Sequence, residues 1–183
     1  MRIYTRKGDG GTTGLLFGGR VAKDSIRIEL NGAVDEAQAT LGLARAEAGP
    51  GSELDELLVA LERDLYVLMA EVATSPENRR KLEAGATLVT PAMVTALEDR
   101  IDDLSGRFDM PTEFVVPGQN RTSATLDLAR TVVRRAERLW VAAGESVEGS
   151  QVGPYLNRLS DLIWTMARWA EGSDHLIARK DGG

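Results

Sequence analysis

The fold of this chain is decided by residues 52–72, which read SELDELLVALERDLYVLMAEV. Apolar side chains recur there at steps of three and four residues, the spacing that aligns them along one face of an α-helix. Those positions are Leu54, Leu57, Leu58, Leu61, Leu65, Leu68, Met69 and Val72. Ser52 can cap this helix, and Asp55 follows at the third position, as in a weak capping box. We predict an amphipathic helix over residues 52–74.

Similar patterns extend the helical prediction in both directions. Thr90 and Pro91 form a helix start, because proline is well placed at the first helical position, and glycines at 85 and 106 interrupt the periodicity. No convincing alternating pattern of a β-strand is visible. The predicted helices cover residues 27–48, 52–74, 90–105, 120–143 and 152–171, with a short basic piece near 76–84. Long helices joined by short loops imply an all-α five-helix bundle.

Length and composition indicate a single domain of 183 residues. We expect an N-terminal segment at 1–25, the bundle at 26–173 and a tail at 174–183, frayed over its last residues. The chain has no cysteine, which excludes disulfides, zinc-thiolate sites and a thiol nucleophile and favours a cytoplasmic location. No secretory signal is visible, and charges interrupt every apolar stretch before the roughly 20 residues of a membrane span. We therefore expect a soluble protein with no membrane partner.

The charge distribution favours a small anionic ligand. The formal net charge is −6, opposite in sign to the basic surface of a general nucleic-acid binder, so no nucleic-acid partner is expected. Two stretches are nevertheless basic: residues 1–23 hold five Lys and Arg side chains against one acid, and residues 130–138 hold four arginines. Local basic patches in an acidic chain suit a small polyanion.

The first basic stretch is also rich in glycine. Residues 5–14 read TRKGDGGTTG, and FGGRVAK follows at 17–23. Glycines let the backbone approach a ligand and direct several N–H groups at one anion, while hydroxyls and cations supply the remaining contacts. This composition is typical of a phosphate-binding loop, although the residue order differs from a Walker A motif. A merely flexible N-terminal tail is the alternative.

The second basic stretch, residues 129–138, reads ARTVVRRAER. Steps of four place Arg130, Arg134 and Arg138 along one helical face, with Glu137 one turn after Arg134. Such a row can hold a triphosphate through forked, charge-assisted hydrogen bonds while the carboxylate orients the guanidinium groups. An ordinary solvent-exposed helix with salt bridges is the alternative.

A third stretch, residues 155–164, reads YLNRLSDLIW and continues into the predicted last helix. Leu156, Leu159 and Ile163 form its core stripe, together with the later Met166. Asn157 and Asp161 lie one turn apart on an adjoining face. This polar pair is a candidate ligand contact, and hydrogen bonding between helices explains it equally well.

Taken together and in this order, the segments resemble the PduO-type ATP:cob(I)alamin adenosyltransferases. The resemblance covers essentially the whole chain and rests on residues 4–23, Val34-Asp35-Glu36, Phe114 to Gly118, Ala129 to Arg138 and Tyr155 to Asp161. Three positions depart from the family pattern. Lys7 replaces a usual threonine, Gln119 stands where a second glycine is common, and Asp127 stands where a histidine is frequent. Lys7 retains a side chain compatible with phosphate, whereas Gln119 alters a loop that borders the corrin site in the family.

The resemblance implies a cobalamin adenosyltransferase-like, ferritin-like bundle that assembles as a homotrimer with ATP bound between neighbouring subunits. ATP-binding residues carried over to the N-terminal segment are Thr5, Arg6, Lys7, Gly8, Thr13, Gly14 and Lys23. Those carried over to the bundle are Arg134, Arg135, Glu137, Arg138 and Asn157. Mg²⁺ would offset the charge of the triphosphate, with no protein ligand assigned to it.

The resemblance also assigns three residues to the reaction itself. Arg130 and Asp35 match a pair that forms an ion pair across the subunit interface in the family. Phe114 matches an aromatic residue that fills the lower face of the corrin and leaves cobalt four-coordinate, which eases reduction of cob(II)alamin to cob(I)alamin. Without the resemblance, core packing would be the simpler role for this phenylalanine. A corrinoid reductase and an enzyme that accepts adenosylcobalamin are the protein partners implied.

The implied reaction is attack of Co(I) on the 5′ carbon of ATP with expulsion of triphosphate. The protein then needs no nucleophile of its own, and its tasks are alignment and stabilisation of the leaving anion. A phosphotransferase or NTPase that releases ADP is one rival, and a bundle that binds a nucleotide without consuming it is another. A ferritin-like metal protein is poorly supported, because His175 is the only histidine.

Overall fold

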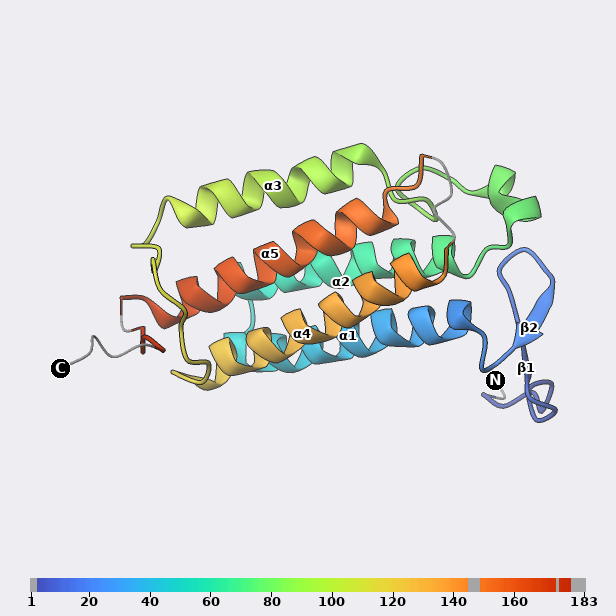
Figure 1. Cartoon of the computed structure of the whole chain (residues 1–183), viewed down its shortest axis with the longest axis horizontal. Coiled ribbons are helices and arrows are strands. Elements are labelled where there is room, and N and C mark those ends of the chain that lie inside the picture. The colour runs from blue at the N-terminus through green and yellow to red at the C-terminus, as the bar shows by residue number, and fades with distance from the viewer. Residues whose placement is uncertain (1–2, 145–148, 174, 179–183) are drawn as a thin grey trace.

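The computed structural model describes residues 3–144, 149–173 and 175–178. In this part of the chain, five α-helices run alternately up and down and form one bundle (Figure 1). They are α1 (Ile26–Ala48), α2 (Glu53–Val72), α3 (Pro91–Ser105), α4 (Arg121–Ala142) and α5 (Val152–Glu171). A 3₁₀-helix, η1 (Pro76–Lys81), replaces the predicted short basic piece. The predicted five-helix bundle is confirmed, and each helix end lies within two residues of its expected position.

The helix starts form for the reasons that the sequence gives. Ser52 caps α2 by accepting a hydrogen bond from the Asp55 amide, and Thr90 caps α3 in the same way through the Met93 amide. The Asp55 carboxylate accepts from the Gly51 amide instead of closing a capping box on Ser52. Side-chain caps of this kind satisfy amides that have no partner within the helix.

The core lies where the apolar stripes of the helices meet. Helix α1 packs against α2 and α4, α4 also packs against α5, and α5 packs against α3. The predicted stripe of α5 is fully buried at Leu156, Leu159, Ile163 and Met166. At the start of α5, a side chain on Gly153 would lie 2.8 Å from Nε1 of Trp140 on α4. The missing side chain therefore allows the two helices to approach closely at this end.

Two short strands were not predicted from the sequence. Strand β1 (Thr12–Gly14) pairs antiparallel with β2 (Arg20–Ala22), with Thr13 opposite Val21. Strands of three residues are too short to show an alternating pattern. The intervening turn carries positive φ angles at Gly18 and Gly19, a conformation that glycine adopts without steric cost. Residues 12–22 of the N-terminal segment thus form a hairpin.

The hairpin lies at the end of the bundle where α1 begins and α4 ends (Figure 1). It is attached there to the end of α2, because the Leu16 amide donates to the Ala73 carbonyl at 2.9 Å. The buried Arg27 of α1 donates to the Val72 and Thr74 carbonyls at 2.8 and 2.7 Å. A cation is favourable at a helix C-terminus, where carbonyl groups have no partner within the helix.

Glu71 organises the same end of the bundle from inside. Its side chain is fully buried and forms an ion pair with Arg79 of η1 at 2.7 Å. It also accepts hydrogen bonds from the Val89 amide at 2.8 Å and the Ser150 hydroxyl at 2.7 Å. A buried carboxylate requires such partners, so Glu71 fixes three connecting segments to α2.

At the opposite end, residues 176–178 pair with residues 114–116 of the loop between α3 and α4. This contact lies within the tail predicted at 174–183, and no pattern in the sequence indicated it. The last residues, expected to fray, lie outside the described part of the chain. No described helix combines the length and the apolar character that a membrane span requires.

Helices α2 and α5 are linked through a carboxylate with a raised pKa. The Tyr155 hydroxyl on α5 donates to Asp64 on α2 at 2.9 Å. Burial raises the pKa of Asp64, and the hydrogen bond from Tyr155 opposes this shift only partly. Burial and the neighbouring carboxylate raise the pKa of Tyr155 well above its usual range. Ionised Asp64 is therefore less favourable in the folded protein than in the unfolded chain.

For Asp64→Asn we expect a gain in stability that depends on pH. The asparagine retains an acceptor for Tyr155 but cannot ionise. Because the pKa of Asp64 is higher in the folded state, the wild type loses stability relative to the variant as pH rises from about 3.9, the ordinary aspartate pKa, through the folded-state pKa. Urea unfolding of both proteins at a series of pH values measures the difference, and a difference that shrinks as pH rises would contradict the expectation.

Candidate functional site

The N-terminal half of the candidate site is ordered by Arg20. Its guanidinium donates to the Lys7 carbonyl at 2.7 Å and to the Thr12 carbonyl and hydroxyl at 3.0 and 2.8 Å. The Lys23 amide donates to the Gly11 carbonyl at 2.9 Å. Arg20 therefore folds the glycine-rich segment back onto the hairpin, and this role was not recognised from the sequence.

Gly8 and Lys23, two of the residues carried over for ATP, lie close together on this hairpin. A side chain on Gly8 would meet Nζ of Lys23 at 3.2 Å. The lysine ammonium thus lies beside a bare stretch of backbone, as a phosphate-binding loop requires. Arg6 has a positive φ of 61° and its guanidinium lies 5.5 Å from the centre of the Tyr4 ring. The side chains of Thr5, Arg6, Lys7 and Lys23 are exposed and free to meet a ligand.

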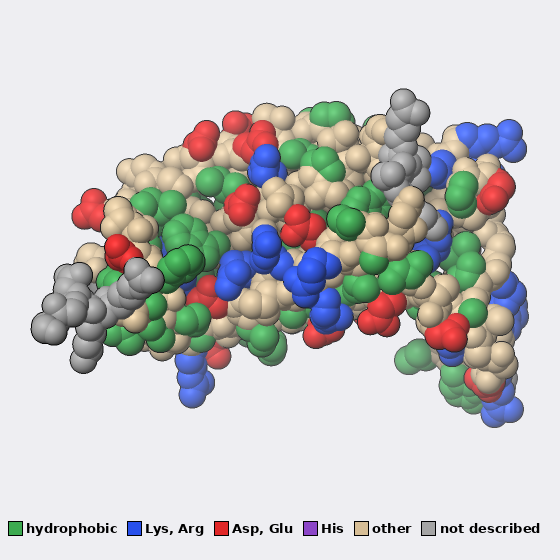
Figure 2. Space-filling view, in the orientation of Figure 1, with side chains coloured by type: hydrophobic (Ala, Val, Ile, Leu, Met, Phe, Trp, Pro, Cys, Tyr) green, Lys and Arg blue, Asp and Glu red, His purple; other side chains and the backbone are tan. Residues whose placement is uncertain are grey.

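The second half of the site is a cationic surface on α4. Figures 1 and 2 show the same face of the molecule, on which α4 and α5 are visible. In Figure 2, Lys and Arg side chains gather over the middle of this face. Arg134 forms an ion pair with Glu137 at 3.7 Å, and Arg138 donates to the Arg134 carbonyl at 3.1 Å. Arg135 forms an ion pair with Glu36 of α1. These contacts orient the guanidinium groups on a surface that remains open to solvent.

Asn157 joins α5 to this surface. Its amide donates to Glu137 at 2.8 Å, and its carbonyl oxygen accepts from Arg158. Arg158 also forms an ion pair with Asp161 at 3.6 Å. The hydrogen bond between helices that the sequence left open is present, and it places Asn157 directly beside the Arg134–Glu137 pair.

The structure does not bring the two halves together within one chain. No hydrogen bond or ion pair among the described residues connects residues 5–23 to α4 or α5. The hairpin instead contacts the end of α2 and η1, where Lys81 lies 5.9 Å from the centre of the Phe17 ring. The two halves of the candidate site therefore have no direct polar contact with each other in the described part of the chain.

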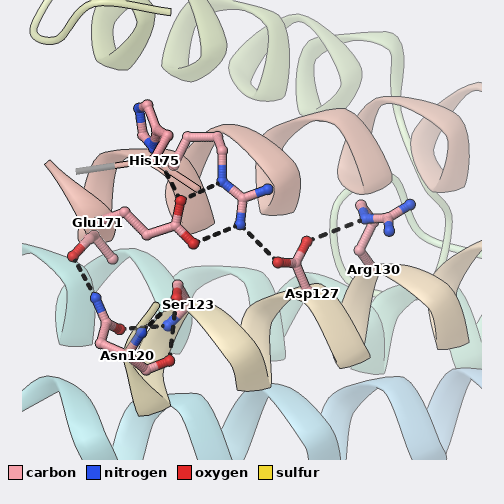
Figure 3. Close-up of polar contacts among 8 residues, drawn as sticks. Asn120, Ser123, Asp127, Arg130, Glu171 and His175 are labelled. Carbon is pink, nitrogen blue, oxygen red and sulfur yellow. Dashed lines mark hydrogen bonds and ion pairs between the residues drawn. The ribbon is translucent and has the colours of Figure 1, made fainter. Parts of the chain in front are cut away.

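Arg130, the first arginine of the row, has a different environment. It pairs with Asp127 at 3.5 Å, and Asp127 pairs with the buried Arg168 of α5 at 2.6 Å. Arg168 pairs in turn with Glu171 at 2.8 Å, and Glu171 contacts His175 at 3.0 Å (Figure 3). Asp127 stands at the position where a histidine is frequent in the family that the sequence resembles. Here it connects Arg130 to a buried chain of ion pairs.

Asp35 is exposed on α1 and forms no hydrogen bond or ion pair with Arg130 in this chain. Among the described residues it forms no ion pair. The same helix exposes Leu43, and α4 exposes Leu128 and Val141, so apolar side chains lie open on the two helices that carry Asp35 and Arg130. The expected pair of Asp35 and Arg130 is thus absent within this chain.

Phe114 lies on the loop between α3 and α4 and is 88% exposed, so it is not a core residue. A pocket of about 430 Å³ lies beside it, lined by residues that include Val115, Pro117, Asp127, Arg130, Trp164 and Arg168. A second pocket of similar size, about 430 Å³, shares Trp164 as a wall and includes Met110, Arg158 and Asp161. Exposed apolar side chains beside hollows of this kind are typical of a ligand site.

Sequence reasoning missed several residues of these hollows. Trp164 lies on α5 within the quoted motif but was assigned no role, although it separates the two pockets. Arg168 and Glu171 lie on the buried face of the same helix. Charged residues three apart on a face otherwise filled by apolar side chains were the signal that could have indicated an internal ion pair.

The fold and the site together define a helical-bundle protein with an oriented cationic surface and, beside the exposed Phe114, a pocket lined by apolar and charged side chains. Comparison with known proteins then gives the family. The sequence pattern of the family described as "Cobalamin adenosyltransferase" matches residues 3–170. The chain belongs to the cobalamin adenosyltransferase family.

Curated relatives are similar over nearly the whole chain. A corrinoid adenosyltransferase of Citrobacter freundii is 39% identical over 178 residues, covering 97% of this chain and 99% of the relative. A corrinoid adenosyltransferase of Mycobacterium tuberculosis is 38% identical over 184 residues, covering 99% of this chain and 94% of the relative. Corrinoid adenosyltransferase PduO of Salmonella typhimurium is 38% identical, and the match covers 95% of this chain but 51% of that protein.

Solved structures agree with the sequence comparisons. A Phe-to-Ala variant of a PduO-type ATP:corrinoid adenosyltransferase from Lactobacillus reuteri, complexed with cobalamin and ATP, superposes with a TM-score of 0.86. It is 26% identical, and the match covers 98% of this chain and 100% of that one. An Arg-to-Lys variant complexed with ATP gives a TM-score of 0.84 at 25% identity, with 97% and 100% coverage.

For Arg168→Ala we expect a loss of about 3–5 kcal/mol in the free energy of unfolding, because Asp127 and Glu171 would keep their buried charges without their shared partner. The matched control is Arg107→Ala. Arg107 pairs with Glu53 and Asp103 at the surface, where such pairs contribute about 0–1 kcal/mol. Urea unfolding measures both variants, and equal losses would contradict the assigned role of Arg168.

Proposed function

We propose that this chain transfers the 5′-deoxyadenosyl group of ATP to the cobalt of cob(I)alamin, giving adenosylcobalamin and triphosphate. Family membership, curated corrinoid adenosyltransferases and relatives solved with cobalamin and ATP support this activity. The observation that carries the proposal in this chain is the unit formed by Arg134, Glu137 and Asn157. It presents an oriented guanidinium group from α4 beside a side-chain amide from α5 to one anion.

The ATP site is proposed to form between two subunits of a homotrimer. One subunit supplies the hairpin segment with Thr5, Arg6, Lys7, Gly8, Thr13, Gly14 and Lys23. Its neighbour supplies Arg134, Arg135, Glu137, Arg138 and Asn157. The separation of these two halves within one chain supports this arrangement, as do the exposed apolar residues of α1 and α4. Asp35 of one subunit would then pair with Arg130 of the next.

The cationic surface would act on the leaving group. Expulsion of triphosphate concentrates negative charge on the phosphate oxygen that leaves the 5′ carbon. Arginines that are already oriented, such as Arg134, stabilise that charge without reorganising during the reaction. Glu137 orients both neighbours, since it forms an ion pair with Arg134 and accepts a hydrogen bond from Asn157. The attacking electron pair comes from Co(I), so the chain supplies no nucleophile.

Mg²⁺ is proposed to enter with ATP rather than as a resident ion of the protein. The described residues include no group of three or more Asp, Glu, His or Cys side chains placed to hold a metal. Mg²⁺ commonly retains several waters and binds substrate phosphates with few protein ligands. When bound, it would neutralise part of the triphosphate charge next to the arginines.

The corrin is proposed to lie against the loop that carries Phe114. An exposed phenylalanine beside a pocket of this size can occupy the lower face of the ring and exclude both water and the lower axial ligand. Without an axial donor, Co(II) accepts an electron more readily. Phe114 is thus assigned the reduction step, while the arginines are assigned the transfer step.

The cellular setting is part of the proposal. The chain would act as one cytoplasmic domain, receive electrons from a corrinoid reductase and pass adenosylcobalamin to an enzyme that depends on it. The absence of cysteine favours a reducing compartment. The reductase would have to reach cobalt while Phe114 holds the lower face.

Product analysis tests the proposed function. The protein is mixed with ATP, Mg²⁺ and chemically reduced cobalamin, and the absorption spectrum of adenosylcobalamin is followed while phosphate products are separated. The proposal expects adenosylcobalamin with an equal amount of triphosphate. Release of ADP would support a phosphotransferase or NTPase, and binding of ATP with no product would support a nucleotide sensor; either result would overturn the proposal.

For Arg134→Ala we expect ATP affinity to fall about 10- to 100-fold, the effect of losing charge-assisted hydrogen bonds worth about 1.5–3 kcal/mol. The fold should persist, because the side chain is half exposed. Arg121→Ala is the matched control, since Arg121 lies on the same helix and its side chain is 88% exposed. Calorimetry with ATP measures both variants. Equal affinities would remove Arg134 from the site.

A further inference from the structure

The loop that carries Phe114 is held by a segment from the far end of the chain. The Val116 amide donates to the Leu176 carbonyl, and the Ala178 amide donates to the Phe114 carbonyl, both at 2.7 Å. Val115 lies opposite Ile177 in this antiparallel bridge. One of the two bonds therefore ends on the backbone of Phe114 itself.

The segment is attached to the bundle at its first described residue. The His175 side chain is 7% exposed and its Nδ1 lies 3.0 Å from Oε2 of Glu171, which is fully buried. The ring of Phe108, from the start of the same loop, meets His175 edge-on with ring centres 6.4 Å apart. Figure 3 shows that His175 lies at one end of the ion-pair chain that reaches Arg130 at the other.

Without this attachment, little in the loop would fix the direction of the Phe114 ring. The loop between α3 and α4 covers residues 106–120, a length at which an unsupported connection samples many conformations. The Phe114 ring is almost fully exposed, so core packing does not fix its direction. Ordering it at the moment of substrate binding would cost conformational entropy, whereas a backbone bridge supplies that order in advance.

We propose that residues 175–178 form a positioning strand that holds Phe114 against the lower face of the corrin. The inference rests on the proposed function and goes beyond it, since it gives the C-terminal segment a part in the reduction of cobalt. The strand acts through Phe114 and contacts no reacting atom. The His175–Glu171 contact connects it to α5, and the Arg168–Asp127 pair connects α5 to Arg130.

The reactions that start from cob(II)alamin and from cob(I)alamin should depend differently on the position of Phe114. Cob(II)alamin must lose its lower axial ligand before reduction, which requires a correctly placed Phe114. Cob(I)alamin that has been reduced chemically has already passed this step. A displaced Phe114 should therefore slow the reaction that starts from cob(II)alamin and a reductant, and leave the reaction from cob(I)alamin nearly unchanged.

Ala178→Pro tests the strand, because proline removes the amide that donates to Phe114. We expect its rate with cob(II)alamin to fall about tenfold, as for the loss of one hydrogen bond that orients a reacting group. The rate with cob(I)alamin and the affinity for ATP should stay within about twofold of the wild type. Ala178→Ser retains the amide and serves as the matched control, with wild-type behaviour expected in both assays.

A spectroscopic measurement reads the same effect on cobalt directly. Electron paramagnetic resonance of cob(II)alamin bound with ATP distinguishes cobalt with and without an axial nitrogen or water ligand. The wild type and Ala178→Ser should hold the four-coordinate form, and Ala178→Pro should shift the population towards a ligated form. A purely structural role for the strand would leave this distribution unchanged.

A second pair of variants tests the attachment. In His175→Ala the contact with Glu171 is lost, and the rate with cob(II)alamin should again fall about tenfold on the same physical grounds. In His175→Asn the amide nitrogen can replace Nδ1, so most of that rate should return. Equal rates for His175→Ala and His175→Asn would contradict the attachment.

The outcomes distinguish the positioning strand from the proposed function. If wild-type protein makes no adenosylcobalamin from cob(I)alamin, the proposed function fails. If the wild type is active and Ala178→Pro matches it in both assays, the positioning strand alone is overturned. An equal loss with cob(I)alamin and cob(II)alamin in Ala178→Pro would also overturn it, since general damage to the site affects both substrates.

Discussion

The packing of α4 between α1 and α5 is the constraint on which the rest of the structure depends. Contact with two helices buries Leu126, Ala129, Val133 and Ala136 completely, and the two alanines allow close approach. The inner face of α4 is filled by these buried apolar residues, and Arg134, Arg135 and Arg138 lie on the part of the helix that stays open to solvent. The same packing places Glu137 within reach of Asn157. The cationic surface is thus a consequence of how the core is filled.

Buried carboxylates secure the connecting segments at both ends of the bundle. Glu71 holds η1 and two loops at the hairpin end, and Glu171 contacts Arg168 and His175 at the other. A charge removed from water is tolerated only with well-placed partners. Each carboxylate therefore specifies one arrangement of the segments around it. The segment that pairs with the Phe114 loop is attached to one of these carboxylates through His175.

The candidate site could be predicted from sequence only where its residues share one helix or one loop. Spacing put Arg134 next to Glu137 and suggested a polar role for Asn157, since contacts three and four residues apart follow from helix geometry. The role of Arg20 escaped prediction because its acceptors are two backbone carbonyls and the Thr12 hydroxyl, and sequence patterns do not reveal such contacts. The bridge between Ala178 and Phe114 escaped for the same reason, and it joins residues far apart in the chain.

The sequence by itself determined the five helices, their ends and the apolar faces that form the core. These features follow from periodicity and capping within single segments, as at Ser52 and Thr90. Only the tertiary structure decided that the glycine-rich segment folds as a hairpin on α2, that Arg168 is buried between two acids, and that residues 175–178 hold the Phe114 loop. Such contacts depend on which segments lie side by side after the helices pack, and local sequence patterns do not show this.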